Sequence, residues 1–460
     1  MNLETLKTQI NSEQIFTDSE AFDTYGRDWT KHYAPKPSAI VFPKTTEEVQ
    51  KIVLWAREQN VALVPSGGRT GLSGAAFALN GEVVVSFEKM NQILDFDSVD
   101  NVVHCQAGVV TEQLQNFAKE KDRLYPVDFA ARGSSQIGGN VATNAGGIKV
   151  IRYGMTREWI SSLTVVTGQG EILKLNGDLV KNATGYDFRH LFIGSEGTLG
   201  LITEVGVRVT RPTKELQVFV FGLPELKDVM EVYKAYNQRF PLMAYEMFTD
   251  LALKYVVEST GLSRPFETAA PFYVLMELEI DHDDTLEQAM ELFESCMEKG
   301  WIIDGTVSQN GQQAKDLWRL REDITEATTH KSPYKNDVSV RVSKVPEFLE
   351  SLSTVIQKEH PTFEVVWFGH IGDGNLHINI LKPDDLSSDE FVARCKTVDK
   401  TMFSMIQNLQ GSVSAEHGVG LTKKPFLGYT RSDAEISYMR SIKKLFDPDG
   451  ILNPGKLFDL

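Results

Sequence analysis

Two glycine-rich segments constrain the fold of this chain more than any other feature. The first is PSGGRTGLSG, from Pro65 to Gly74, and the second is GSSQIGGNVATNAGG, from Gly133 to Gly147. Glycine lacks a Cβ, so such a loop can take positive φ and bring its backbone N–H groups close to an anion. In the first segment Gly67, Gly68, Gly71 and Gly74 let the backbone take positive φ. This segment has the character of a phosphate-binding loop, although it matches neither the Walker sequence nor GxGxxG, and a tight structural turn is the alternative.

The second segment is expected to be a loop whose small residues let a flat ligand lie against the backbone. Its polar side chains are neutral hydrogen-bonding groups, namely Ser134, Ser135, Asn140, Thr143 and Asn144. A neutral wall of this kind suits a nucleotide or a flavin better than a metal ion. A plain glycine-rich loop is the alternative, and the first segment nearby argues against it.

Around these segments the N-terminal half alternates short apolar strands with helices. A capping box at Thr45 and Glu48 begins one helix, and another helix begins near Thr111. The strands predicted from apolar runs are 39–42, 61–64, 83–87, 101–108, 160–167, 170–175 and 198–209. Arg211-Pro212 ends this part of the chain and is expected to be a domain boundary.

The C-terminal half predicts a second domain of mixed type. Strands are expected at 217–222, 273–280 and 305–307, and helices at 226–240, 285–299 and 314–327. This order predicts an α+β cap with an antiparallel sheet that is covered on one side. Arg321 and Thr325 are four residues apart on the last helix, so they share a neighbouring face, for which a solvated surface is the alternative. Met243, Glu246 and Phe248 are expected to be core and rim residues without a chemical role.

The stretch from Trp367 to Ile380, WFGHIGDGNLHINI, indicates strand, tight turn, strand. Asp373-Gly374 is a strong hairpin signal, because a type I′ turn needs positive φ at both central residues. With that turn His370 pairs with His377, and their Cβ atoms lie about 5 Å apart on one face. Two imidazoles at this separation suit one metal ion, and Asn379 lies on the same face. Two ordinary surface histidines are the alternative.

Glu416-His417, in GSVSAEHGVG, adds a carboxylate and a further imidazole. On an extended backbone adjacent side chains point to opposite sides, so one can bind a metal while the other faces a different atom. Two histidines and a glutamate with an open position form a common catalytic metal site. A surface pair is the alternative for these two residues alone.

Composition excludes several classes of function. The chain has 460 residues, so two or three domains are expected. Its formal net charge of -16 argues against binding to nucleic acid or an anionic membrane, but not against a small anionic substrate. The cysteines, Cys105, Cys296 and Cys395, are scattered, which favours a reducing compartment, and we expect the cytoplasm. The N-terminus shows no signal or transit pattern, and no apolar run is long enough for a membrane span.

Four motifs in this order carry a resemblance: PSGGRTGLSG, GSSQIGGNVATNAGG, NATGYD at 182–187 and GSEGTLGLITE at 194–204. They resemble the FAD-binding domain of the vanillyl-alcohol oxidase (PCMH) type. From about residue 36 to the C-terminus, the chain is most similar to the FAD-linked D-2-hydroxy acid dehydrogenases, which include D-2-hydroxyglutarate and D-lactate dehydrogenases. The resemblance implies an α+β fold in three parts: an FAD-binding domain at 1–212 (core 36–212), a substrate-binding cap with the metal-binding hairpin at 213–412, and a segment at 413–460 that packs on the FAD domain and completes the active site.

The same resemblance assigns the FAD-binding residues. The pyrophosphate would be bound by Ser66, Gly67, Gly68, Arg69, Thr70, Gly71 and Gly74. The flavin side would be contacted by Pro126, Gly133, Ser134, Gly138, Asn140, Thr143, Asn144, Ala145 and Gly147. Near the adenine would lie Glu196, Gly197 and Ile202, and near the flavin edge Asn453. Some relatives attach FAD through a histidine close to the first segment, but this chain has Thr70 and Ser73 there, so non-covalent FAD is expected.

The resemblance also assigns the substrate site. A divalent metal would be bound by His370, His377 and Glu416, for which zinc suits the donors and manganese or cobalt are alternatives. His417 would be the catalytic base and would contact the substrate together with Asn379. The distal carboxylate of the substrate would be bound by Arg321, Thr325 and Lys335. The run Val340–Ser343, VRVS, departs from the apolar, proline-containing pattern of the family, which leaves the shape of this pocket open.

The implied activity is FAD- and metal-dependent oxidation of a D-2-hydroxy acid to the 2-oxo acid by hydride transfer to the flavin. D-2-hydroxyglutarate is the preferred substrate, because a second anionic group would justify both Arg321 and Lys335. D-lactate, glycolate and D-malate are alternatives in the same family. A metal hydrolase would leave the glycine-rich segments unexplained, and a flavin subunit without turnover would leave the metal and base residues unexplained. The electron acceptor, an electron-transfer flavoprotein or a quinone, leaves no mark in the sequence, and neither does the choice between monomer and homodimer.

Overall fold

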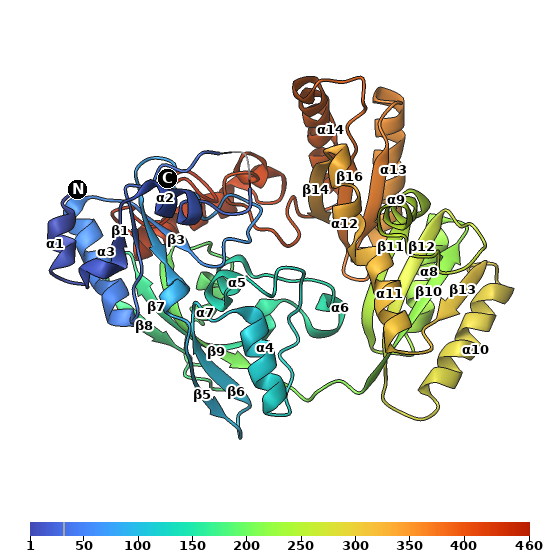
Figure 1. Ribbon diagram of the computed structural model, residues 1–460, viewed down its shortest axis with the longest axis horizontal. Coiled ribbons are helices and arrows are strands. Elements are labelled where there is room, and N and C mark those ends of the chain that lie inside the picture. Colours follow the sequence, from blue (N-terminus) through green and yellow to red (C-terminus); the bar gives the residue numbers. More distant parts are fainter. Residues whose placement is uncertain (31–32) are drawn as a thin grey trace. The chain divides into compact units, whose positions relative to one another are not determined.

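The structure is a computed structural model that describes residues 1–30 and 33–460 (Figure 1). The chain divides into two compact units. Unit 1 consists of Met1–Gly147, Tyr153–Pro212 and Glu416–Leu460, and unit 2 consists of Ile148–Arg152 and Thr213–Ala415. The C-terminal segment of the chain therefore belongs to the same unit as the two glycine-rich segments.

Unit 1 contains two sheets. In the four-stranded sheet, of order β1-β2-β4-β3, strand β4 is parallel to both of its neighbours and β1 is antiparallel to β2. The five-stranded sheet, of order β5-β6-β9-β7-β8, is antiparallel throughout. The strands are β1 (Ile15–Phe16), β2 (Ala39–Val41), β3 (Leu63–Ser66), β4 (Val83–Ser86), β5 (Ile93–Asp97), β6 (Val102–Gln106), β7 (Ile160–Thr167), β8 (Ile172–Leu175) and β9 (Gly200–Arg208). The helices are α1 (Leu3–Lys7), α2 (Ser19–Tyr25), α3 (Thr46–Gln59), α4 (Thr111–Glu120), α5 (Ile137–Thr143), α7 (Arg189–Phe192) and α15 (Asp433–Phe446).

Local sequence explains the first of these elements. All four residues of β4 are buried, as expected for a strand with parallel neighbours. Helix α3 begins after Thr45, whose Oγ1 accepts the N–H of Glu48 at 3.2 Å. The Glu48 carboxylate accepts the N–H of Lys44 at 2.7 Å, one residue before the cap, so only half of the predicted capping box forms. The apolar stripe of α3 is fully buried in the core of unit 1: Val49, Ile52, Val53 and Ala56.

Unit 2 is built on a seven-stranded antiparallel sheet of order β13-β10-β12-β11-β15-β16-β14. Its strands are β10 (Glu215–Leu223), β11 (Leu242–Thr249), β12 (Phe272–Ile280), β13 (Asp304–Val307), β14 (Tyr334–Ser339), β15 (Val365–Gly369) and β16 (Asn375–Ile380). Its helices are α8 (Leu226–Asn237), α9 (Asp250–Thr260), α10 (Thr285–Glu298), α11 (Gly311–Glu322), α12 (Ile324–Ala327), α13 (Val345–Glu359) and α14 (Ser388–Asn408). The short helix α6 (Val150–Tyr153) begins in unit 2 and ends in unit 1.

Helices cover both faces of this sheet, whereas the sequence predicted cover on one side. Helix α8 packs on one face, where the Tyr236 ring lies 5.7 Å from the ring of Phe221 on β10. Helix α9 packs on the other face, where Leu253 joins a buried cluster with Val220 of the same strand. Because successive strand side chains point to opposite faces, Val220 and Phe221 mark the two covered sides.

Two predicted elements were wrong in detail. The second glycine-rich segment is not a loop throughout, since α5 lies inside it. A Cβ on Gly138 would lie 2.6 Å from the Cβ of Ala107, so close packing requires glycine here and outweighs its poor helix propensity. The helix predicted at 314–327 is interrupted at Asp323, where α11 ends and α12 begins.

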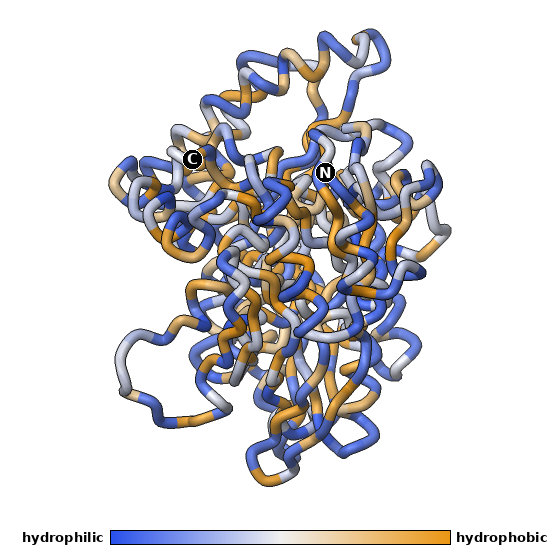
Figure 2. Tube along the Cα trace, turned by 90° about the vertical axis from the view of Figure 1, so that its left-hand side faces the viewer, coloured by the Kyte–Doolittle hydropathy of each residue, from blue (hydrophilic) through white to orange (hydrophobic). Residues whose placement is uncertain are grey.

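The hydrophobic residues are distributed along the chain in short stretches and not in long apolar runs. Figure 2 shows short hydrophobic stretches alternating with hydrophilic ones along the trace. Within residues 1–30 and 33–460, every helix is too short or too polar to cross a membrane.

Candidate functional site

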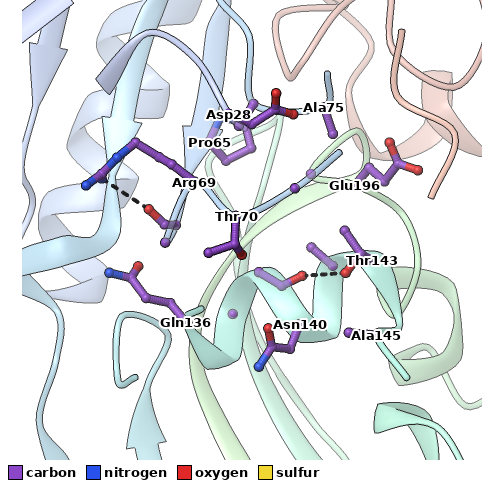
Figure 3. A pocket seen from close by; sticks show the side chains of 18 of the residues that line it. Asp28, Pro65, Arg69, Thr70, Ala75, Gln136, Asn140, Thr143, Ala145 and Glu196 are labelled. Atoms are coloured by element: carbon purple, nitrogen blue, oxygen red, sulfur yellow. Dashed lines mark hydrogen bonds between the residues drawn. The ribbon is translucent and has the colours of Figure 1, made fainter. Parts of the chain in front are cut away.

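A cavity of about 310 Å³ lies in unit 1, and both glycine-rich segments line it (Figure 3). All of its lining residues belong to unit 1. Most of them come from the first segment, from α5 and its flanks, from the turn before β9 and from the C-terminal segment. The predicted cofactor residues that line the cavity are Ser66, Gly67, Gly68, Arg69, Thr70, Gly71, Gly138, Asn140, Thr143, Ala145, Glu196, Gly197, Ile202 and Asn453.

The remaining predicted cofactor residues are not part of this lining: Gly74, Pro126, Gly133, Ser134, Asn144 and Gly147. Asn144 has a structural role, because it ends α5 at φ +51° and its Oδ1 accepts the N–H of Arg157 at 2.9 Å. A Cβ on Gly147 would lie 2.3 Å from the carbonyl oxygen of Asp128. The sequence analysis missed several lining residues, including Asp28, Phe129, Gln136 and Gly139. The last two lie inside a motif that had already been recognised, whereas Asp28 and Phe129 lie in stretches without any motif.

Of the four glycines of the first segment, one takes the positive φ that is open to all of them. Gly74 has φ +78°, but Gly67, Gly68 and Gly71 do not have positive φ, and the left-handed position is taken by Arg69 at φ +58°. Gly68 is needed for another reason. A Cβ there would lie 2.1 Å from the carbonyl oxygen of Ser134, so the backbones of the two glycine-rich segments touch where no side chain fits.

The guanidinium of Arg69 is bound by the protein itself. Its Cζ lies 4.5 Å from the centroid of the Tyr25 ring, and its Nη1 lies 3.5 Å from Glu88 Oε2. The same nitrogen donates to the carbonyl oxygen of Gly67 at 3.3 Å. In Figure 3 the Arg69 side chain points away from Thr70 and Asn140. Its charge is therefore already paired with Glu88, and its contacts stabilise the loop.

The chemistry of the cavity wall fits a dinucleotide such as FAD. The buried atoms of the wall that have no hydrogen-bond partner in the part of the chain that the structure describes include Ser66 Oγ, Gln136 Oε1 and Asn453 Oδ1. Buried polar atoms are nearly always hydrogen-bonded, so these three indicate a ligand with donors and acceptors of its own. Much of the remaining wall is small and neutral, which leaves room for a flat ring: Gly138, Gly139, Ala142, Ala145 and Gly146.

Glu196 connects this wall to the C-terminal segment. Its carboxylate accepts the backbone N–H of Val419 at 2.6 Å and that of Gly420 at 2.8 Å. Burial raises the pKa of Glu196 to about 7, against the lowering effect of these two hydrogen bonds. The carboxylate assigned to the adenine side by resemblance is therefore bound to the backbone that follows Glu416-His417.

Glu416 and His417 also line the cavity of unit 1. The side chain of His417 is 33% exposed, and its Nε2 lies 3.7 Å from Glu416 Oε1. The prediction that these two side chains point to opposite sides was wrong, because the backbone bends here instead of running as a strand. A titratable imidazole thus lies in the wall of the cavity that fits a flavin nucleotide.

The predicted hairpin is present in unit 2, but its register differs. His377 is opposite Phe368 and not opposite His370, because the connection runs from His370 to Gly374 instead of being a two-residue turn. Of the two predicted turn residues, Gly374 alone has positive φ, +85°. A register shift of two residues keeps side chains on the same face. The two histidine rings therefore still meet, with centroids 5.3 Å apart.

One face of the sheet in unit 2 collects the predicted polar residues. On β14 and β16, Lys335 is directly opposite Asn379, and Asp337 is directly opposite His377. Directly opposite residues of an antiparallel pair share a face. The Asn379 side chain is 2% exposed, and its Nδ2 has no hydrogen-bond partner among the described residues.

Glu246 on β11 belongs to this site, although the sequence analysis expected it to be a core or rim residue without a chemical role. Its side chain is 1% exposed, its Oε1 lies 2.8 Å from His370 Nδ1, and its Oε2 lies 2.9 Å from Arg321 Nη2. The guanidinium of Arg321 also lies over the ring of Phe368, at 4.8 Å from the centroid. The sequence offered one signal for this role, a single glutamate within an otherwise apolar strand. A carboxylate that is buried in such a strand requires a partner.

The three predicted carboxylate-binding residues differ in environment. Arg321, on α11, is 6% exposed. Thr325, on α12, and Lys335, on β14, are both exposed. Arg321 and Lys335 therefore lie on the same face of the sheet, whereas Thr325 is exposed on α12.

The donor atoms of unit 2 fit a divalent metal. A carboxylate only accepts hydrogen bonds, so the contact with Glu246 puts the proton of His370 on Nδ1 and the lone pair on Nε2. The ring planes of His370 and His377 meet at 80°, which allows one nitrogen of each to approach a shared ion. The predicted third ligand, Glu416, follows directly after the last residue of unit 2.

Comparison with known proteins supports the assignment of FAD to this chain. Residues 37–176 match the family described as FAD binding domain, and residues 213–457 match the family described as FAD linked oxidases, C-terminal domain. The chain is 56% identical over 456 residues to D-2-hydroxyglutarate dehydrogenase of Stutzerimonas stutzeri (strain A1501), which covers 99% of this chain and 98% of that protein. It is 52% identical over 455 residues to the protein of the same name from Xanthomonas citri pv. viticola, with 99% and 96% covered.

Among solved structures, p-cresol methylhydroxylase with substrate bound superimposes with a TM-score of 0.76 at 15% identity. The match covers 99% of this chain and 96% of that one. This likeness confirms the α+β fold of the vanillyl-alcohol oxidase type that the motifs predicted.

Proposed function

This chain belongs to the FAD-linked D-2-hydroxy acid dehydrogenases, a family of oxidoreductases, and on that basis we propose that it oxidises D-2-hydroxyglutarate to the 2-oxo acid. The two relatives compared above carry the name of this activity and match over nearly their whole length. Bound FAD, non-covalent as the sequence predicts, supplies the ring that accepts the hydride from C2 of the substrate.

In this proposal His417 is the general base that takes the proton of the substrate hydroxyl. An imidazole suits this role near neutral pH. The observation that carries the proposal is the position of His417 in the wall of the same cavity that the two glycine-rich segments line. The contact of Glu196 with Val419 and Gly420 supports it, because it fixes the backbone just beyond the base.

A divalent ion bound by His370, His377 and Glu416 would supply Lewis acidity that lowers the pKa of the substrate hydroxyl. Zinc suits this donor set, and manganese and cobalt are the alternatives. Asn379, on the same strand and face as His377, would orient the substrate through its Nδ2 donor.

Arg321 and Lys335 would bind the distal carboxylate. The Nε and Nη2 donors of Arg321 have no hydrogen-bond acceptor among the described residues, although Nη2 forms the ion pair with Glu246. Lys335 is exposed and opposite Asn379, where its ammonium can reach an anion on that face. Thr325 would add a hydroxyl donor from α12. Two cations justify a dicarboxylate better than a substrate with a single carboxylate such as D-lactate.

The test compares D-2-hydroxyglutarate, D-lactate and the two L forms with an artificial dye as electron acceptor. Wild-type kcat/KM should be highest for D-2-hydroxyglutarate. Lys335→Met should lower that kcat/KM by about 10- to 100-fold, the worth of one hydrogen bond to a charged group, and leave the D-lactate value unchanged. A wild-type preference for D-lactate, or equal losses with both acids, would overturn the assignment of the distal carboxylate.

A further inference from the structure

Glu246 is a buried carboxylate that contacts two residues of the proposed site, His370 and Arg321. It belongs to β11, and Phe248 two residues later is opposite Phe368 of β15. Because strand side chains alternate, Glu246 lies on the face that carries Phe368 and His377. With only 1% of its surface exposed, its charge must be balanced by partners within the protein.

The first partner is His370. The contact of 2.8 Å from Nδ1 to Glu246 Oε1 fixes the ring rotation as well as the tautomer. A carboxylate behind a metal-binding histidine acts in this way in many metal sites, because it directs the opposite nitrogen at the ion and makes it more basic.

The second partner is Arg321. Its Nη2 lies 2.9 Å from Glu246 Oε2, and its guanidinium plane is supported by the ring of Phe368. Together these contacts hold a long, flexible side chain in one orientation.

We propose that Glu246 is a positioning residue that serves both halves of the site: through Oε1 it aims His370 at the metal, and through Oε2 it holds Arg321 for the distal carboxylate. This inference rests on the proposed function. It predicts that a change at Glu246 weakens metal binding and substrate binding together, although Glu246 itself contacts neither ligand.

The test uses Glu246→Gln with Glu277→Gln as the matched control. Glu277 is also a buried carboxylate of the same sheet, 4% exposed on the neighbouring β12, but its partners are Lys149 and Trp318. Both variants would be purified with FAD, stripped of metal and titrated with Zn²⁺ against a competing chelator. Glu246→Gln should bind Zn²⁺ about 10-fold or more weakly and show a raised KM for D-2-hydroxyglutarate, whereas Glu277→Gln should match wild type in both.

Zn²⁺ binding of wild-type strength in Glu246→Gln would overturn the role of Glu246, and so would equal losses in both variants. Wild-type protein that binds no divalent ion would overturn the metal site itself, and the coupling with it. If Glu246→Gln does not fold, the tautomer of His370 in metal-stripped wild type decides, measured by NMR after ¹⁵N-histidine labelling and assigned with His370→Gln. A proton on Nδ1 supports the proposal, and a proton on Nε2 refutes it.

Discussion

Gly68→Ala should damage the cavity of unit 1 from inside the protein, without touching any charged group. The added Cβ would lie 2.1 Å from the carbonyl oxygen of Ser134 and 2.8 Å from the Cα of Ser135. Both contacts are with backbone, so no side chain can rotate away. Real Cβ atoms essentially never come within 3.0 Å of such atoms, so the first and second glycine-rich segments must separate by roughly 1 Å.

Overpacking of this kind costs about 1–3 kcal/mol, and the rigid backbone on both sides favours the upper half of that range. For a unit of this size the loss should lower the unfolding temperature by roughly 4–10 °C. Because Gly67 to Gly71 line the cavity, the displaced loop should also bind FAD more weakly. The assays are thermal unfolding of the FAD-free protein by circular dichroism and FAD titration by fluorescence quenching.

Gly139→Ala is the matched control. Gly139 lines the same cavity, but a Cβ there has no atom within 4 Å. It lies inside α5, where alanine is the better helix former by about 0.5–1 kcal/mol, so the FAD-free variant should be as stable as wild type or slightly more stable. Gly68→Ala with the unfolding temperature and FAD affinity of wild type would refute the claim that the two segments touch through their backbones.

Two further predictions concern titratable groups of the same cavity. Burial raises the pKa of Glu196 from 4.5 to about 7, so the folded protein retains a proton that the unfolded chain releases above pH 4.5. The stability from this group is therefore fully present below pH 4.5 and is lost as the pH rises through 7. The side chain introduced by Glu196→Gln does not titrate, so in this variant the fall in unfolding free energy from pH 4.5 to 7 should be smaller by up to about 3 kcal/mol. Equal pH slopes in the variant and the wild type would contradict the assignment. His417→Gln should lower kcat with D-2-hydroxyglutarate by about 10²- to 10⁴-fold while the FAD content stays that of wild type, and a kcat close to wild type would remove His417 as the base.

The strands of both units could largely be predicted, because they depend on local patterns. The run Val83 to Phe87 is apolar except for Ser86, and in the structure Val83–Ser86 forms β4. The hairpin was found from Asp373-Gly374, but its register was not, since the longer connection depends on contacts outside the hairpin. The N–H of Gly372 donates to the carbonyl oxygen of Tyr245 at 3.1 Å, a contact 127 residues away in the chain that no local rule contains.

Failures at the glycines and at Glu246 have the same origin. A glycine in the sequence indicates that φ is free to be positive. At Gly68 and Gly138, however, glycine is required because the backbone packs directly against Ser134 and Ala107 respectively, where a Cβ does not fit. A lone glutamate in an apolar strand does not reveal whether it lies at the rim or in the core. Its partners His370 and Arg321 come from other elements, so the role of Glu246 becomes visible only once the sheet of unit 2 is assembled.

The central claim is that this D-2-hydroxy acid dehydrogenase binds FAD and uses His417 as the base, with a metal bound by His370, His377 and Glu416. The anaerobic flavin spectrum of the purified protein tests this claim most directly. D-2-hydroxyglutarate should bleach the oxidised flavin band, and the L form should not. Chelator should abolish the bleaching, and a divalent ion should restore it. A flavin that no D-2-hydroxy acid reduces, or that D-2-hydroxyglutarate reduces equally well after complete removal of metal, would contradict the account.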